Sequence, residues 1–167
     1  MTTSYKTITS LFITIVFLVL ISACGESKQQ QMLHQAVKIE TSDECHLCGM
    51  MISEFSGPKG EIYRKEGGGV KKFCSTRDMF SYYLDPENKR NVSQLLVHDM
   101  SKMPWDKLND TFFIDAKQAW FVAGSTKTGA MGKTLASFSK KEDAAAFAKE
   151  YGGKVISFKQ ITLDELL

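Results

Sequence analysis

The segment Cys45-His46-Leu47-Cys48-Gly49-Met50 places three kinds of metal donor within six residues: thiolate, imidazole and thioether. Thiolate and thioether sulfurs are soft ligands that favour Cu(I) and do not suit the hard cations calcium and magnesium. Zn(II) takes cysteine and histidine readily but gains little from methionine. Gly49 lets the backbone turn sharply, so Cys48 and Met50 could point at one ion. The segment therefore predicts a site for a soft metal.

Other possible donors lie further along the chain. Met131 stands between small residues, after a polar loop, in Gly129-Ala130-Met131-Gly132. This setting suits an exposed thioether ligand as well as a methionine that covers an apolar patch. His98 and Met100 follow a predicted strand and would point to the same side of it. Each of them could add a donor or belong to the core.

The spacing Cys45-x-x-Cys48 also fits two other uses. A redox dithiol of the thioredoxin type stands at the start of a helix, which lowers the thiol pKa, whereas residues 50–58 favour a strand and loop. A structural zinc site needs four ligands, which both cysteines, Cys74 and one histidine could supply. Cys74 ends a predicted strand, a position typical of a small buried apolar side chain, although it could come near Cys48. A thiol–disulfide oxidoreductase and a zinc-binding structural protein therefore remain alternatives.

The N-terminal residues have the pattern of a bacterial lipoprotein signal. Lys6 supplies a positive n-region, and the apolar run 11–21 is too short for a comfortable transmembrane helix but has the length of a signal h-region. Small residues precede Cys24, where lipid would be attached. We expect residues 1–23 to be a signal peptide and the rest to lie outside the cytoplasm, on the periplasmic face of a bacterial inner or outer membrane. A short membrane anchor or an ordinary cleaved signal is the alternative.

Charge and cysteine number limit the function further. The net charge is +2 for the whole chain and about +1 once Lys6 is removed, and no dense basic tract is present, which argues against a nucleic-acid partner. Without Cys24, three cysteines remain. An odd number in an oxidising compartment does not indicate a disulfide framework and favours a thiol with a chemical task.

The elements that would position these donors form an α+β pattern. Residues 24–41 read as a lipidated flexible tether, with 37–39 either its end or a short strand. Two similar β-β-α-β units should follow, over residues 42–100 and 101–167, and form one compact domain. In the first unit we expect strands at 61–64, 70–73 and 92–97, and a helix to residue 84 that Ser75 caps.

The second unit is expected to repeat this order. Its strands are predicted at 111–114, 119–123 and 155–158, and its helix at 144–151. Ser139 should cap that helix, with Glu142 at the capping-box position. Gly152-Gly153 should end it.

These features together resemble the NosL family of lipoprotein copper chaperones for the assembly of nitrous oxide reductase. The matching residues run in family order from the lipidation site to Gly152-Gly153-Lys154-Val155. They are Cys24, His46-Leu47-Cys48-Gly49-Met50, Ser56-Gly57-Pro58-Lys59-Gly60-Glu61-Ile62, Arg77-Asp78, Asp99-Met100, Ile114-Asp115-Ala116 with Ala119, and Gly129-Ala130-Met131-Gly132.

The resemblance implies a monomeric periplasmic carrier, not an enzyme, that binds one Cu(I) and delivers it during assembly of the CuZ centre. Its partners would be the maturation complex of nitrous oxide reductase, a membrane transporter with an associated periplasmic protein, or the apo-reductase. The family's ligand positions carry over as Cys48, Met50 and Met131, and His46 matches a family histidine. Many members have only the cysteine before Gly-Met. The additional Cys45 could form a disulfide with Cys48 or contribute a second thiolate.

Overall fold

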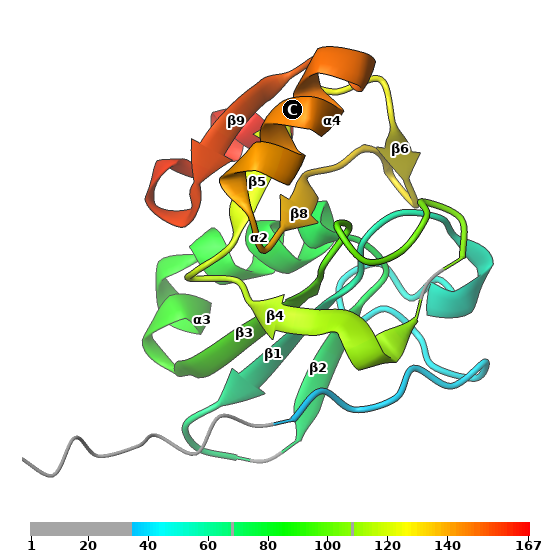
Figure 1. Cartoon of the computed structure of the whole chain (residues 1–167). Coiled ribbons are helices and arrows are strands. Elements are labelled where there is room, and N and C mark those ends of the chain that lie inside the picture. The colour runs from blue at the N-terminus through cyan, green and yellow to red at the C-terminus, as the bar shows by residue number, and fades with distance from the viewer. Residues whose placement is uncertain (1–34, 68, 108) are drawn as a thin grey trace, which may run out of the picture. The chain divides into compact units, whose positions relative to one another are not determined.

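Two antiparallel sheets form the framework of the described part of the chain (Figure 1). The computed structural model describes residues 35–67, 69–107 and 109–167. The predicted signal peptide, the lipidation site Cys24 and the first part of the predicted tether lie outside these residues. No helix among the described residues combines the length and the apolar character needed to cross a bilayer.

The first sheet has four strands in the order β2-β1-β3-β4. Their bounds are β1 (Gly60–Arg64), β2 (Val70–Phe73), β3 (Val92–His98) and β4 (Phe113–Asp115). Helix α2 (Thr76–Leu84) packs on this sheet, and the short helix α3 (Pro86–Arg90) follows it. The approach of α2 to β1 is close, because a Cβ atom at Gly60 would lie 2.5 Å from Met79 Sδ. Any other residue at this position would force the buried Met79 side chain to move.

The start of α2 follows the expected capping pattern. Ser75 Oγ accepts a hydrogen bond of 3.0 Å from the backbone N–H of Asp78, which satisfies one of the free donors of the first turn. The helix ends before Asp85, as predicted. Asp85 also caps a second helix, which was not predicted. Its side chain accepts from the backbone N–H groups of Glu87 and Asn88, and Pro86 occupies the first turn of α3.

The second sheet has three strands in the order β8-β5-β9. Their bounds are β5 (Trp120–Ala123), β8 (Ala136–Phe138) and β9 (Lys154–Ser157). Helix α4 (Lys141–Tyr151) connects β8 to β9, and the small hairpin β6 (Thr128–Gly129) and β7 (Gly132–Lys133) projects between β5 and β8. Four 3-10 helices complete the described elements: Ile52–Glu54, Asp110–Phe112, Phe158–Gln160 and Leu163–Leu166.

The predicted strand over residues 111–114 was wrong in detail. Residues 110–112 form a 3-10 helix, because the Asn109 side chain accepts from Thr111 N at 2.9 Å, and the strand begins only at Phe113. That strand pairs with β3 of the first sheet and not with β5. The partners of β5 are β8 and β9, and β8 is a three-residue strand that is too short to show an alternating pattern in the sequence.

Ser139 was also predicted wrongly as a helix cap. Helix α4 begins at Lys141, and its cap residue Lys140 makes no side-chain hydrogen bond to the helix. The backbone N–H of Ser139 donates to Asp99 Oδ1 at 3.0 Å, and its hydroxyl also interacts with that carboxylate. Asp99 comes directly after β3, so Ser139 ties the two halves together and is not free to cap α4.

In both larger sheets the strand that comes first in the sequence lies in the centre. β1 lies between β2 and β3, and β5 lies between β8 and β9, with a helix before the third strand in each case. The mixed helix and strand content agrees with the predicted α+β class. That two similar β-β-α-β units arose by duplication stays a prediction.

One buried ring joins the two sheets. Phe80 of α2 is fully buried, and its ring centroid lies 5.3 Å from that of Phe121 on β5 and 5.9 Å from that of Phe158 after β9. The same core cluster contains Ile62 and Leu95 of the first sheet. Burial of this shared apolar surface holds α2, and therefore the residues at its N-terminus, in a fixed position.

Candidate metal centre

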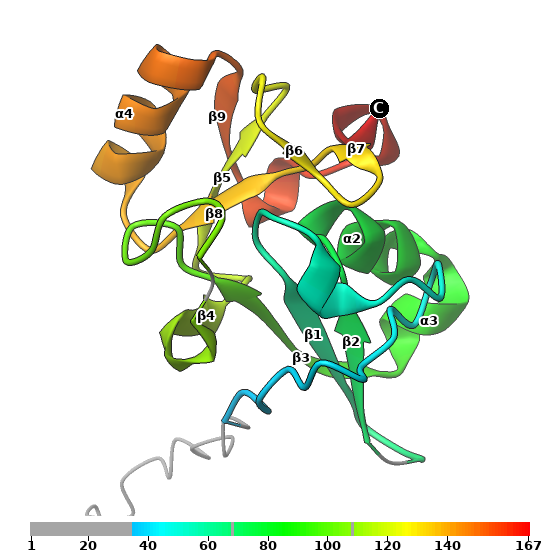
Figure 2. The same cartoon turned by 90° about the vertical axis from the view of Figure 1, so that its right-hand side faces the viewer.

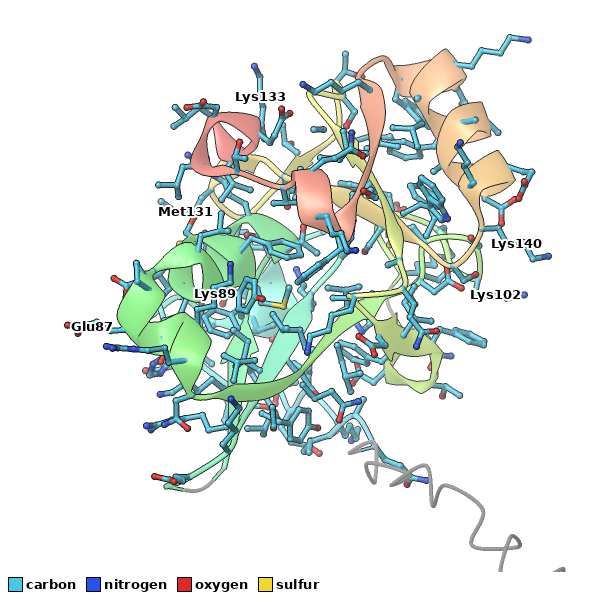
Figure 3. The ribbon with its side chains drawn as sticks, turned by 90° about the vertical axis from the view of Figure 1, so that its left-hand side faces the viewer. Glu87, Lys89, Lys102, Met131, Lys133 and Lys140 are labelled. Atoms are coloured by element: carbon cyan, nitrogen blue, oxygen red, sulfur yellow. The ribbon has the colours of Figure 1, made fainter. Side chains whose placement is uncertain are left out.

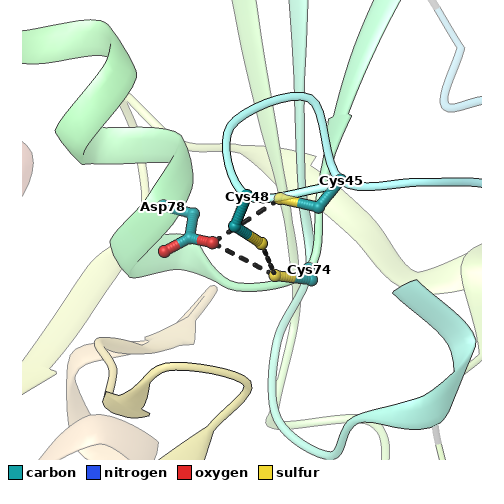
Figure 4. Close-up of side chains that lie close together, drawn as sticks. All are labelled: Cys45, Cys48, Cys74 and Asp78. Atoms are coloured by element: carbon teal, nitrogen blue, oxygen red, sulfur yellow. Dashed lines mark hydrogen bonds between the residues drawn. The ribbon is translucent and has the colours of Figure 1, made fainter. Parts of the chain in front are cut away.

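Three sulfurs and one carboxylate converge at the N-terminal end of α2 (Figure 4). The Sγ atoms of Cys45, Cys48 and Cys74 and a carboxylate oxygen of Asp78 all lie within 4.8 Å of one another. Cys48 Sγ is 3.4 Å from Cys74 Sγ, and Asp78 Oδ2 is 3.1 Å from Cys74 Sγ and 3.5 Å from Cys45 Sγ. All three cysteines are free thiols. Such a set can hold one soft metal ion.

A tight turn brings Cys45 and Cys48 to this place. The backbone N–H of Gly49 donates to the carbonyl of Cys45 at 2.9 Å, and Cys45 N donates to the carbonyl of Met50 at 2.8 Å. Gly49 has a φ of +74°, which confirms the expected sharp turn. The N–H of His46 donates to the carbonyl of Lys72 at 2.9 Å and so fastens the turn to β2. Cys48 consequently lies against Cys74, the residue that follows β2.

The helix terminus supplies the other half of the cluster. Cys74 precedes the cap residue Ser75, and Asp78 lies in the first turn of α2. Unpaired backbone N–H groups give the start of a helix a partial positive charge that favours nearby anions. Thiolates are therefore stabilised here, and Asp78 adds a hard oxygen donor that was not predicted as a ligand from the sequence.

The three thiols do not ionise alike. A hydrogen bond from Cys74 lowers the pKa of the Cys45 thiol to about 5. The same interaction with Cys45 raises the pKa of Cys74, and burial raises the pKa of Cys48. The reduced cluster thus carries one thiolate readily and resists further ionisation. A bound cation must displace the remaining protons, so metal affinity is expected to increase with pH.

A buried lysine lies behind the cluster. The side chain of Lys59 is 1% exposed, and its Nζ donates to the carbonyl of Cys74 at 2.9 Å and to that of Phe55 at 2.6 Å. Burial lowers the pKa of Lys59 to about 8, while the nearby Cys74 and Cys45 thiols act in the opposite direction. Lys59 fixes the backbone that presents Cys74 and adds positive charge near the thiolates. In the sequence, Lys59 was notable only as part of the motif Gly57-Pro58-Lys59-Gly60.

Met131 lies at the tip of the β6–β7 hairpin with half of its surface exposed (Figure 3). Arg77, the residue before Asp78, donates from Nη1 to the carbonyl of Met131 at 2.6 Å. A Cβ atom at Gly129 would lie 3.5 Å from Ser75 Cβ, so the hairpin packs against the cap of α2. The structure therefore brings Met131 to the end of α2 that carries the thiols, although 57 residues separate it from Cys74.

His46 and Met50 flank the turn. Met50 is half-buried against the core, and its backbone N–H lowers the pKa of Cys48 in opposition to burial. His46 Nε2 lies 2.7 Å from Lys71 Nζ. Burial, followed by the charges of Lys71 and Arg64, lowers the pKa of His46. This shift favours the neutral ring, the form that binds a metal ion.

His98 and Met100 lie elsewhere in the structure. Both ring nitrogens of the fully buried His98 already have partners, since Nδ1 accepts from Lys59 N at 3.3 Å and Nε2 lies 3.1 Å from Asp110 Oδ1. Met100 packs with the apolar cluster around Val122 and Phe138. Neither residue belongs to the group of Cys45, Cys48, Cys74 and Asp78.

The buried His98 predicts a loss of stability on mild acidification. Burial lowers the pKa of His98 below its ordinary 6.5 in the folded chain. The unfolded chain therefore binds more protons as pH falls through 6.5, and the free energy of unfolding decreases. Urea unfolding at pH 7.5 and 5.5 should show a smaller pH dependence for His98→Asn than for wild type. Equal pH dependence in both proteins would contradict this assignment.

The fold and the cluster define a small α+β domain with a thiol-rich cluster at a helix N-terminus that could hold a metal ion. The chain belongs to the NosL family: the NosL family model matches residues 36–166. This confirms the resemblance stated from the sequence.

Two curated relatives are copper-binding lipoproteins NosL. The protein of Stutzerimonas stutzeri is 45% identical over 141 residues, which cover 84% of this chain and 73% of the relative. That of Achromobacter cycloclastes is 34% identical over 148 residues, which cover 87% and 76%. Neither relative is named as an enzyme.

Two solved structures share the fold. The crystal structure of the copper chaperone NosL from Shewanella denitrificans is 58% identical, with a TM-score of 0.76, and the match covers 78% of this chain and 97% of that chain. The solution structure of apo-NosL from Achromobacter cycloclastes is 31% identical, with a TM-score of 0.51, and the match covers 65% and 88%. Because apo-NosL from Achromobacter cycloclastes has a solution structure, the experiments proposed below use residues 25–167 of this chain.

Proposed function

We propose that the protein is a Cu(I) metallochaperone, anchored through lipid on Cys24 at the periplasmic face of the membrane. It would deliver copper for maturation of the CuZ centre of nitrous oxide reductase. The observation that carries the proposal is the cluster of three thiols and Asp78 within 4.8 Å at the start of α2. Membership of a family whose relatives are named copper-binding lipoproteins and a copper chaperone supports it.

The cargo would be held by a graded set of ligands. Cys48 is the most exposed of the three cysteines, while Cys45 and Cys74 are buried behind it. Soft, anionic thiolates give tight Cu(I) binding. The thioethers of Met50 and Met131 and the neutral ring of His46 are uncharged and exchangeable. An acceptor with its own histidine or methionine ligands would displace these weaker ligands first. Transfer would exchange only metal ligands, and no covalent bond of a substrate would be made or broken.

The same cluster is chemically suitable for Zn(II). Three thiolates and one carboxylate supply the four ligands of a tetrahedral zinc site. A methionine such as Met131 adds nothing to zinc affinity, so it distinguishes the two metals. We retain Zn(II) as a second possible cargo, with Cu(I) favoured by the soft donors at the surface.

Copper transfer to apo-nitrous oxide reductase tests the proposal. Residues 25–167, loaded anaerobically with one Cu(I), should lose copper to the apo-reductase, or to the apo-reductase together with its membrane maturation complex. Copper in the re-isolated reductase and nitrous oxide reduction are the readouts. The Cys48→Ser chain should transfer none. Equal activation by the Cys48→Ser chain would contradict the proposal.

Met131 should contribute to copper affinity and not to folding. Met131→Leu keeps the size of the side chain but removes the sulfur, and loss of one weak ligand is expected to reduce Cu(I) affinity about 10-fold. Competition with a Cu(I) chelator measures the change. Met100→Leu is the matched control, because Met100 packs in the second apolar cluster. An unchanged affinity for Met131→Leu would remove this residue from the ligand set.

The alternative function, a thiol–disulfide oxidoreductase using Cys45 and Cys48, has less support. The Cys-x-x-Cys turn is followed by a three-residue 3-10 helix and not by an α-helix. The lowered pKa of the first thiol, Cys45, comes instead mainly from its hydrogen bond with Cys74. Cys74 is the hydrogen-bonding neighbour of Cys48. Reduction of insulin disulfides by the reduced chain, lost in Cys45→Ser, would favour this alternative.

A further inference from the structure

We propose that Cys48 and Cys74 are a modification site: in the absence of copper they form a disulfide that blocks the metal centre. This inference rests on the proposed function and concerns the regulation of the same site. The co-reactant is an external disulfide, on a protein or a small molecule, which accepts the two electrons. Cu(I) bound to the thiols prevents the reaction, so only the empty chain is oxidised.

The two sulfurs are already in contact. Cys48 Sγ lies 3.4 Å from Cys74 Sγ, and both residues are free thiols. Sulfurs joined in a disulfide are about 2.05 Å apart, so a small rotation of the side chains brings this pair to bonding distance. From the sequence, Cys45 was the possible disulfide partner of Cys48. The structure instead places Cys74 against the Cys48 sulfur.

Hydrogen bonds to the backbone hold the two cysteines side by side. The N–H of His46 donates to the carbonyl of Lys72 at 2.9 Å, which fastens the turn that contains Cys48 beside the end of β2. The buried Lys59 Nζ donates to the carbonyl of Cys74 at 2.9 Å. Figure 2 shows the segment of the cysteine turn in front of the first sheet. The bond therefore forms without a rearrangement of the sheet.

Differences in exposure determine which thiol reacts first. Cys45 is 3% exposed and Cys74 is fully buried, whereas Cys48 is half-buried. Access to the attacking sulfur is one of the factors that control thiol–disulfide exchange. An external disulfide therefore reacts with Cys48, and the thiol nearest to Cys48 completes the exchange.

The exchange has two steps. Cys48 Sγ attacks one sulfur of the external disulfide, whose S–S bond breaks, and the first external thiol leaves with the proton of Cys48. Cys74 Sγ then attacks Cys48 Sγ, which breaks the mixed disulfide, and the second external thiol leaves with the proton of Cys74. The chain loses two electrons and two protons, and the external disulfide becomes two thiols.

Oxidation and copper loading exclude each other. Thiolates are the form of cysteine that binds metal ions, and the disulfide leaves Cys45 as the remaining thiol of the cluster. Bound Cu(I) stabilises the reduced form by mass action, because it binds that form alone. Oxidising compartments such as the periplasm favour disulfides. At the proposed location an empty chain must therefore be reduced by a dithiol before it can take up copper.

Peptide mapping identifies the bond. Reduced, copper-free residues 25–167 contain only the three cysteines of the cluster. They are incubated with bis(2-hydroxyethyl) disulfide under anaerobic conditions, the remaining thiols are alkylated, and tryptic peptides are analysed by mass spectrometry. Cys45 and Cys48 share peptide 39–59, and Cys74 lies in peptide 73–77. We expect these two peptides to be joined, with the alkyl label on Cys45.

Substitution of single cysteines separates their roles. Cys45→Ser should still give the joined peptides, whereas Cys74→Ser should give none. Circular dichroism shows whether each variant is folded. The peptide map of the unsubstituted chain identifies the bond by itself, so the test holds even if Cys74→Ser does not fold.

Copper supplies the second measurement. Residues 25–167 loaded with one Cu(I) should form the disulfide at least about 10-fold more slowly than the empty chain. The oxidised chain should lose tight Cu(I) binding in competition with a chelator. Reduction with dithiothreitol, which is then removed, should restore that binding.

Four results would overturn the inference and leave the proposed function intact. Three concern the bond: a disulfide within peptide 39–59, joined peptides with the label on Cys48, and no disulfide between cysteines of the chain. The fourth is equal Cu(I) affinity of the oxidised and reduced chains. Failure of the reduced chain to retain Cu(I) would instead contradict the proposed function, and the peptide map does not depend on copper.

Discussion

Replacing Cys48 by serine is expected to lower Cu(I) affinity by more than about 100-fold. Removing a residue that only hydrogen-bonds to a metal ligand already lowers metal affinity by roughly 10- to 100-fold. Cys48 would bind the metal directly, and it is the thiol through which Cu(I) would enter. Serine preserves size but offers a hard, protonated oxygen in place of a soft thiolate. Anaerobic competition with a Cu(I) chelator on reduced residues 25–167 measures the change.

The control for this variant is Leu47→Ala. Leu47 precedes Cys48 and is exposed, so its truncation alters the same turn without removing a donor. It should bind Cu(I) as wild type does. If Cys48→Ser retained wild-type affinity, Cys48 would not be a ligand, and the buried pair Cys45 and Cys74 would have to hold the metal alone.

Truncation of Phe80 to alanine is expected to destabilise the fold by about 4 kcal/mol, the cost typical of removing a fully buried phenylalanine. Phe80 contacts rings from the second sheet and from the segment after β9, so its removal leaves a cavity where both halves of the molecule meet. Urea unfolding measured by circular dichroism gives the free-energy change.

Two further variants serve as comparisons for Phe80→Ala. Phe80→Leu retains most of the volume and should cost less than half as much as Phe80→Ala. Leu163→Ala removes a side chain that is 60% exposed and should change stability by less than about 0.5 kcal/mol. A cost below 1 kcal/mol for Phe80→Ala would contradict a shared core between the two sheets.

Local signals in the sequence predicted the parts of the site that local geometry determines. The Ser75 cap and the sharp turn at Gly49 were both confirmed. Each depends on a few adjacent residues, a cap hydroxyl or a positive φ, and such features are visible without knowledge of the rest of the chain.

The convergence of the cysteines depended on long-range packing and was only partly predictable. Cys74 was expected to be a buried apolar side chain that could come near Cys48, and it is both buried and 3.4 Å from the Cys48 sulfur. In the sequence, Asp78 was named only within the motif Arg77-Asp78 of the family resemblance. The signal that could have identified it is its place three residues after the cap Ser75, because a side chain at that position can reach back toward the residues that precede the helix.

The pairing of the short strands in the second half also depends on long-range packing and could not be predicted from local sequence. Phe113–Asp115 and Ala136–Phe138 are each three residues long, and either could have been the partner of β5. The choice depends on which sheet edge is available, because β4 completes the edge beside β3. No pattern within three residues records that information.

The most direct test of a thiol-bound Cu(I) is X-ray absorption at the copper K edge. The sample would be reduced residues 25–167, loaded anaerobically with one equivalent of Cu(I). We predict an edge typical of Cu(I) and a first shell dominated by sulfur, with the sulfur contribution reduced in Cys48→Ser. A first shell of nitrogen and oxygen only, or failure of the reduced wild-type chain to retain copper, would contradict the account.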